Sequence, residues 1–125
     1  MRPPKSFVRA SEPGWTSVEL RDKLPFDQAW QSAVDIVAKQ FEMEMISKDG
    51  GYARTAWLYT WAKQGRTSEN YRVRVIIKFS ADRKSIDIKA EANYLQKGEW
   101  VVGYDDRLLS TVKSDIMGVI GRTTR

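Results

Sequence analysis

Two neighbouring segments, residues 71–79 and 85–94, carry alternating side chains that fit together in a single antiparallel register. If Ser80 pairs with Ser85, the same register also places Lys78 opposite Asp87 on one side. Because a shift of one residue would turn every side chain to the opposite face, this agreement predicts a hairpin with one apolar and one charged face. The apolar pairs are Phe79 with Ile86, Ile77 with Ile88, Val75 with Ala90 and Tyr71 with Tyr94, and the second charged pair is Arg74 with Glu91.

An amphipathic helix is predicted between Phe26 and Phe41. Apolar residues recur there at three- and four-residue steps, whereas Asp35, Lys39 and Gln40 fall elsewhere. Asp27 suits the N-cap or the first turn, where a carboxylate accepts from free amides and opposes the helix dipole. The apolar positions are Phe26, Ala29, Trp30, Ala33, Val34, Val37 and Phe41.

Shorter alternating segments predict four more strands. A strand over residues 15–21 directs Val18 and Leu20 inward, and Met43–Ser47 meets a tight turn at Asp49-Gly50. A return strand, Tyr52 to Trp61, leads into a polar loop over residues 62–69, and Trp100–Val102 follows a turn at Lys97-Gly98. In the return strand, one face is expected to hold Ala53, Thr55, Trp57, Tyr59 and Trp61.

A second helix is predicted to begin at Asp105 and to stop near Gly121. Its apolar stripe is Leu108, Leu109, Val112, Ile116, Val119 and Ile120. Two helices can cover only one face of an antiparallel sheet, so the order of elements predicts a two-layer α+β sandwich.

The chain is expected to form one domain, over residues 15–121. Residues 1–14 hold Pro3, Pro4, Pro13 and Gly14 with little apolar content, which predicts a flexible arm. Residues 122–125 are expected to form a frayed basic tail.

Composition excludes several classes of chemistry. The 125 residues include no His and no Cys, so the chain has no imidazole base, thiolate nucleophile or zinc-thiolate site. We therefore expect no catalytic residue, no metal and no cofactor. The net charge of +5 is spread along the chain, which favours solubility over a polyanion partner. No apolar run approaches the ~20 residues that a membrane-spanning helix needs.

The aromatic residues allow two interpretations. Trp57, Tyr59 and Trp61 could stack nucleobases, as aromatic sheet faces of RNA-binding modules do. In the predicted strands, however, they share the apolar face that the helices must cover, whereas Arg72 and Arg74 alternate to the other face. Core packing is therefore the preferred interpretation, and a nucleic-acid partner is not expected.

Part of the sequence resembles a known family. Residues 26–30 (Phe-Asp-Gln-Ala-Trp), a helix ending near Phe41, residues 45–52 (Met-Ile-Ser-Lys-Asp-Gly-Gly-Tyr) and Arg54-Thr55 follow its layout. This pattern, over residues 24–61, resembles the BamC-type (NlpB-type) lipoprotein domain of bacterial outer-membrane assembly. The resemblance implies a helix-grip fold, in which an antiparallel sheet wraps a long C-terminal helix. It implies no catalytic residues. The family is anchored through an acylated N-terminal Cys and pairs two such domains, neither of which this sequence provides.

The leading functional hypothesis is a non-enzymatic binding module of a bacterial cell-envelope protein, BamC-like, whose partner is another envelope protein. It is expected in the periplasm, with membrane attachment only through an N-terminal anchor of a full-length form. Candidate partner-binding residues are Trp61, Arg66, Trp100 and Tyr104, which lie near predicted element ends. The alternatives are a cytoplasmic nucleic-acid-binding domain that uses diffuse basic charge, and a carrier that holds an apolar ligand between sheet and helix.

Overall fold

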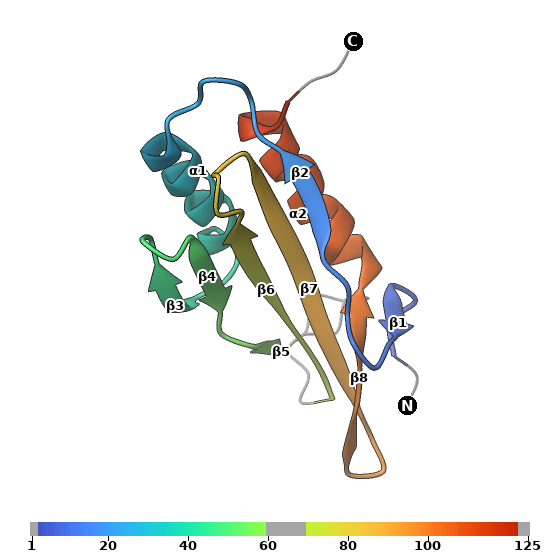
Figure 1. Ribbon diagram of the computed structural model, residues 1–125. Coiled ribbons are helices and arrows are strands. Elements are labelled where there is room, and N and C mark those ends of the chain that lie inside the picture. Colours follow the sequence, from blue (N-terminus) through green and yellow to red (C-terminus); the bar gives the residue numbers. More distant parts are fainter. Residues whose placement is uncertain (1–2, 60–69, 123–125) are drawn as a thin grey trace.

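The computed structural model describes residues 3–59 and 70–122. Its sheet has the strand order β1-β8-β7-β6-β4-β3, with β2 pairing with β7 and β5 pairing with β6 (Figure 1). In chain order the elements are β1 (Phe7–Arg9), β2 (Thr16–Glu19), α1 (Phe26–Ala38), β3 (Met43–Ser47), β4 (Tyr52–Thr55), β5 (Leu58–Tyr59), β6 (Tyr71–Phe79), β7 (Ser85–Gln96), β8 (Glu99–Asp105) and α2 (Asp106–Ile120).

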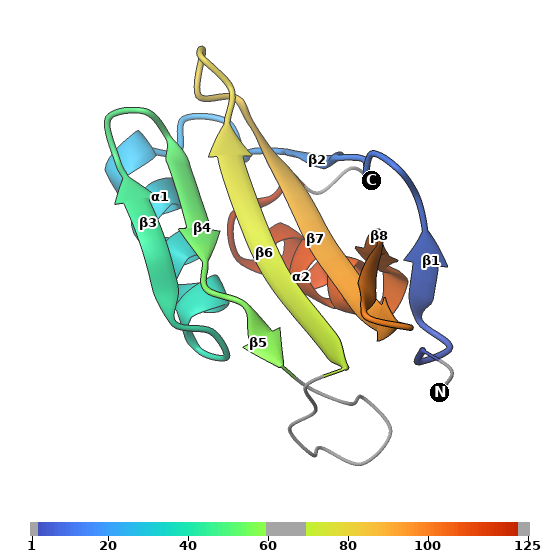
Figure 2. The ribbon, with the colours of Figure 1, turned by 90° about the horizontal axis from the view of Figure 1, so that it is seen from below.

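The protein is a two-layer α+β sandwich, as predicted. Both helices lie on the same side of the antiparallel sheet (Figure 2), and they contact each other as well as the strands. The core between the layers is dry, since Val75 is 1% and Ile88 is 0% exposed. Phe79, at the end of β6, packs its ring edge-on against Phe26 and beside Trp30 of α1.

The β6–β7 hairpin has the register that the sequence predicts. Phe79 pairs with Ile86, Ile77 with Ile88, Val75 with Ala90 and Tyr71 with Tyr94. On the opposite side, Lys78 lies opposite Asp87 and Arg74 opposite Glu91, as predicted. Arg74 forms an ion pair of 2.6 Å with Glu91, whereas the Asp87 carboxylate accepts a hydrogen bond from Ser17 of β2.

Both helices turn their predicted stripes toward the core, although Phe26, Val34, Leu108 and Leu109 are only partly buried and Val119 is exposed. Ala29, Trp30, Ala33 and Val37 of α1 are buried, and so are Val112, Ile116 and Ile120 of α2. Val119 was expected in the stripe of α2, but it is 49% exposed because it lies at the margin of the helix face that meets the sheet.

The N-terminal arm prediction is wrong for Phe7–Arg9, which form β1 and pair with β8. Gly103 makes this approach possible, because a Cβ at that position would come within 2.1 Å of the backbone oxygen of Val8. The ring of Phe7 packs edge-on against Tyr94 at 5.0 Å. Phe7–Arg9 are therefore part of the folded domain. At the other end, the backbone N–H of Arg122 donates to Glu19, whereas residues 123–125 of the predicted tail lie outside the described residues.

The buried carboxylate of Asp105 joins the N-terminal segment, β6 and α2. It accepts hydrogen bonds from the Ser6 hydroxyl at 3.0 Å, from the Tyr71 hydroxyl at 2.6 Å and from the backbone N–H of Leu108 at 2.9 Å. The last bond caps α2. Three segments far apart in the sequence thus depend on one side chain.

Replacing this carboxylate should destabilise the fold. We expect Asp105→Ala to lower the free energy of unfolding by about 3 kcal/mol, because it leaves buried donors without an acceptor. Asp106→Ala is the control, since Asp106 is exposed in the same helical turn and its loss should cost less than about 1 kcal/mol. Urea unfolding followed by tryptophan fluorescence measures both, and equal losses would contradict the role of Asp105.

The stability of the protein should fall at high pH through Tyr71. Burial, and then the hydrogen bond to Asp105, raise the pKa of Tyr71 far above its ordinary value. The folded state therefore keeps this proton when the unfolded state has lost it above about pH 10. Below that pH the contribution of Tyr71 is complete, and above it we expect a loss of about 1.4 kcal/mol per pH unit. Unfolding at pH 8 and pH 11, compared with Tyr71→Phe, isolates this contribution, because the variant should lack it; equal pH dependence in both proteins argues against it.

Candidate binding surface

The side of the sheet that faces away from the helices carries both aromatic and basic side chains. This arrangement differs from the sequence prediction, which placed Trp57 and Tyr59 in the core. In the structure, Tyr59 pairs with Arg72 and so shares its face, while the ring of Trp57 lies beside the Arg72 guanidinium. We call this side the outer surface; its principal residues are Trp15, Trp57, Tyr59, Arg72, Arg74, Ile76, Lys78, Lys89, Glu91, Trp100, Val102 and Tyr104.

An extra residue between β4 and β5 explains why the prediction failed. Arg54 pairs with Ile76, and Leu58 pairs with Val73, so four steps along β4–β5 match three along β6. The regular alternation of inward and outward side chains is thereby shifted by one residue. Ala56, whose backbone N–H donates to Glu42, lies at this irregularity, and the aromatic rings after it point outward.

Arg72 occupies the centre of the outer surface. The carbon of its guanidinium group lies 4.2 Å from the ring centre of Trp57 and 4.1 Å from that of Trp100. Its Nε donates to Asn93 at 3.0 Å, and its Nη1 donates to the hydroxyl of Tyr59 at 3.3 Å. We refer to these five residues as the Arg72 cluster. It brings together β5, β6, β7, β8 and the segment before β5.

Cation–π contacts continue along the sheet from the Arg72 cluster. Arg74 lies 4.3 Å from the ring of Trp57 while it bonds to Glu91, and Lys89 lies 4.9 Å from the ring of Trp15. Such contacts stabilise by ~0.5–1 kcal/mol each at exposed sites. Ile76, on the same face, is only 6% exposed, so the long side chains around it cover much of the sheet.

The predicted partner-binding residues fall into two groups. The structure places Trp100 in the Arg72 cluster and Tyr104 on the same surface, opposite Glu91. Trp61 and Arg66 lie outside the described residues. The sequence prediction missed Trp57, Tyr59 and Arg72 as a group. One signal was available in the sequence. The predicted alternation places apolar Leu58 on the outward face of the strand, together with Arg54. A shift of one residue between them turns Leu58 inward and the aromatic rings outward.

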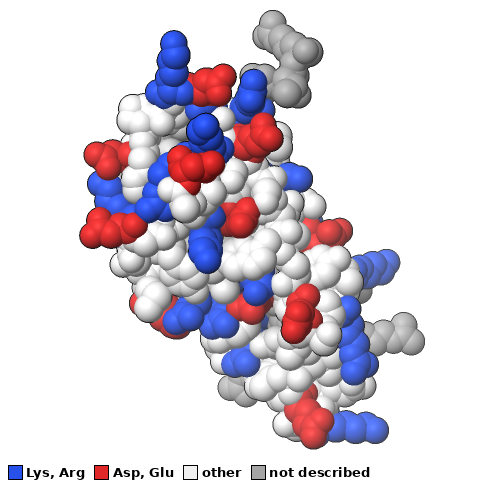
Figure 3. Space-filling view, in the orientation of Figure 1, with Lys and Arg blue, Asp and Glu red and all other residues white. Residues whose placement is uncertain are grey.

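The charges on the view of the molecule in Figure 3 are mixed, with basic and acidic side chains interspersed and no large area of one sign. This distribution agrees with the diffuse charge expected from the sequence. The outer surface is therefore distinguished by its aromatic–arginine contacts rather than by net charge alone.

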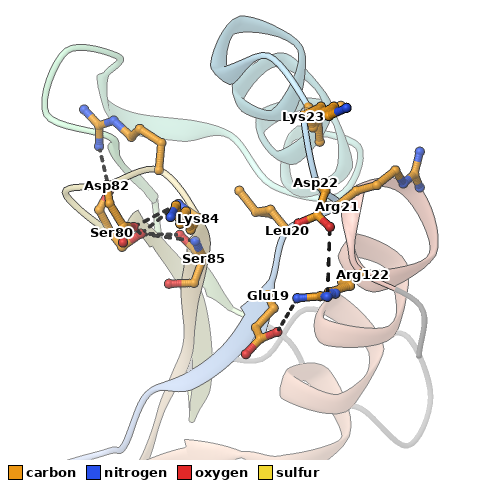
Figure 4. A pocket seen from close by; sticks show the side chains of 12 residues that line it. Glu19, Leu20, Arg21, Asp22, Lys23, Ser80, Asp82, Lys84, Ser85 and Arg122 are labelled. Carbon is orange, nitrogen blue, oxygen red and sulfur yellow. Dashed lines mark hydrogen bonds and ion pairs between the residues drawn. The ribbon is translucent and has the colours of Figure 1, made fainter. Parts of the chain in front are cut away.

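A hollow of about 650 Å³ lies between the loop that follows β2 and the turn between β6 and β7 (Figure 4). Its charges are largely satisfied within its own walls. On one side, Arg122 lies 3.8 Å from Glu19 and 3.9 Å from Asp22. On the other, the Ser80 hydroxyl donates to Asp82, and this bond, with the backbone N–H of Lys84, lowers the pKa of Asp82.

A second hollow, of about 300 Å³, lies between the sheet and the first turn of α2. It is where the apolar-carrier hypothesis would place a ligand, and Phe41, Leu58 and Leu108 line it. Its buried polar groups, Tyr71 and Asp105, already bond to each other. Within residues 3–59 and 70–122, no cluster of three or more potential metal-ligating side chains is present.

Neither α1 nor α2 has the length and apolar character that crossing a lipid bilayer requires. Comparison with protein-family models and with curated proteins finds no match for this chain. The geometry of the outer surface is therefore the observation from which a function must be argued.

Proposed function

We propose that this chain is a non-enzymatic protein-binding module that engages its partner through the outer surface. The observation that carries the proposal is the grouping of Trp57, Trp100, Tyr59 and Arg72 on the sheet face opposite to α1 and α2. Trp, Tyr and Arg are the residues that most often dominate the binding energy of protein interfaces. Side chains held on a hydrogen-bonded sheet are also presented without a large loss of backbone conformational entropy on binding.

The absence of His and Cys from the sequence supports the non-enzymatic part of this proposal, because it removes the usual general bases and activated nucleophiles. The resemblance of residues 24–61 to BamC-type domains supports the context. In this proposal the partner is another bacterial envelope protein and the compartment is the periplasm, with any membrane attachment through an N-terminal anchor of a full-length form.

Binding of single-stranded nucleic acid is the second candidate function. It is favoured by one specific observation: Trp57 and Trp100 lie on the same face as Arg72 and Arg74, whereas the sequence prediction had separated aromatic from basic residues. Aromatic rings combined with basic side chains are the usual means of holding single strands. This candidate requires affinity that falls steeply as salt rises.

Site-specific photo-cross-linking tests which face of the protein binds. We expect benzoylphenylalanine at Val102, an exposed outer-surface position, to cross-link a partner in a bacterial envelope extract. The matched control is the same substitution at Val119, which is similarly exposed on α2. Adducts should form at Val102 only, and the double variant Trp57→Ala/Trp100→Ala should reduce their yield several-fold.

The nature of the adduct separates the candidate functions. An adduct that survives nuclease treatment supports a protein partner, whereas loss on nuclease treatment favours the nucleic-acid candidate. No adduct from Val102, or equal yields from Val102 and Val119, would refute binding through the outer surface.

A further inference from the structure

Arg72 is ordered before any ligand arrives. Its guanidinium carbon lies 4.2 Å from the ring centre of Trp57 and 4.1 Å from that of Trp100, and two of its nitrogens donate to Asn93 and Tyr59. A long arginine side chain normally loses considerable rotamer freedom when it binds. In the Arg72 cluster this conformational entropy is lost when the domain folds. A ligand that binds Arg72 therefore does not lose it again.

Arg72 still has donors to offer. Its Nη2 donates to no atom within the described ranges, 3–59 and 70–122, and its side chain has no acidic partner there within 4.0 Å. A guanidinium with a free edge binds an oxyanion through charge-assisted hydrogen bonds. Arg74 cannot serve in the same way, because Glu91 already occupies it at 2.6 Å.

The charges around Arg72 favour an acidic ligand of moderate charge density. Lys78 and Lys89 share its face and have no ion-pair partner among the residues whose positions are described. The acidic groups of the surface are engaged: Glu91 with Arg74, Glu44 with Arg54, and Asp87 with Ser17. From Arg72 to Lys78 the strand extends ~20 Å, about six residues of an extended chain.

We propose that Arg72 anchors a carboxylate of an extended, acidic segment of the partner protein, with Lys89 and Lys78 attracting further carboxylates along the sheet. This inference rests on the proposed function, and it names the chemistry of the partner. A peptide fits better than a nucleic acid because the Trp57 and Trp100 rings already contact Arg72, so those ring faces are not open for bases to stack on.

Binding of defined probes to the whole chain tests this inference. The probes are octaglutamate, uncharged octaglutamine and a single-stranded oligothymidylate of equal length. Their binding is measured by tryptophan fluorescence at low ionic strength. We expect octaglutamate to bind, octaglutamine not to bind, and added salt to weaken the complex. Arg72→Gln should reduce the affinity for octaglutamate by about tenfold or more.

Two further variants separate position from charge. Arg72→Lys keeps the charge but loses the planar stacking and the free edge, so its affinity should lie between those of wild type and Arg72→Gln. Lys39→Gln makes the same change of net charge at an exposed position just after α1 and should leave affinity within about twofold of wild type. If Arg72→Gln fails to fold, the double variant Lys78→Gln/Lys89→Gln provides the test, since an acidic segment along the sheet requires both lysines.

Each outcome is decisive. Octaglutamate affinity that is unchanged in a folded Arg72→Gln protein overturns the inference and leaves Arg72 with a structural role only. Equal binding of octaglutamine, or no binding of octaglutamate, also overturns it. Tighter binding of oligothymidylate replaces the acidic segment with a nucleic acid. In all these cases a protein adduct at Val102 would still support the proposed function, whereas its absence would refute that function separately.

Discussion

The pairing of β6 with β7 is the constraint on which the rest of the structure depends. Its register decides which side chains face the helices and which face solvent, and each neighbouring strand takes its orientation from one of these two strands. The apolar pairs make the inner face a core that both helices need. The same pairing leaves Arg72 and Arg74 on the other face, where the aromatic side chains of β8 and of the segment before β5 meet them. Core and binding surface are thus two results of one register.

Sequence-based prediction succeeded for elements that nearby residues determine, and it failed for elements that depend on residues far away in the sequence. The β6–β7 hairpin and the stripe of α1 depend on nearby residues, so periodicity was sufficient to identify them. The outward position of Trp57 depends on how Leu58 pairs with Val73, which the strand's own pattern does not contain. The strand at Phe7–Arg9 depends on Gly103, almost the whole chain away, and three residues carry too little pattern to be recognised. Side-chain alternation therefore predicted the layers but not the composition of the outer surface.

The Arg72 cluster changes how the aromatic content of the chain is interpreted. Five Trp residues in 125 could all have served the core, yet among those that the structure describes Trp30 of α1 is buried, while Trp57, Trp100 and Trp15 lie on the opposite side of the sheet. Large aromatic residues outside a core are costly to hydrate and are informative where they gather. Here Trp57 and Trp100 contact the Arg72 cation, and Trp100 also packs against Tyr59, so the surface combines apolar area with a fixed positive charge. This combination is suited to selective recognition more than to non-specific adhesion.

The contact of β1 with Gly103 has a consequence for how the protein is made. Because β1 pairs with β8, and Ser6 bonds to Asp105, the cap of α2, which lies 99 positions later, this segment needs a distant part of the chain. Contacts of such high sequence separation form late and slow the folding of small domains. During synthesis on the ribosome, β1 must therefore remain unpaired until β8 has emerged.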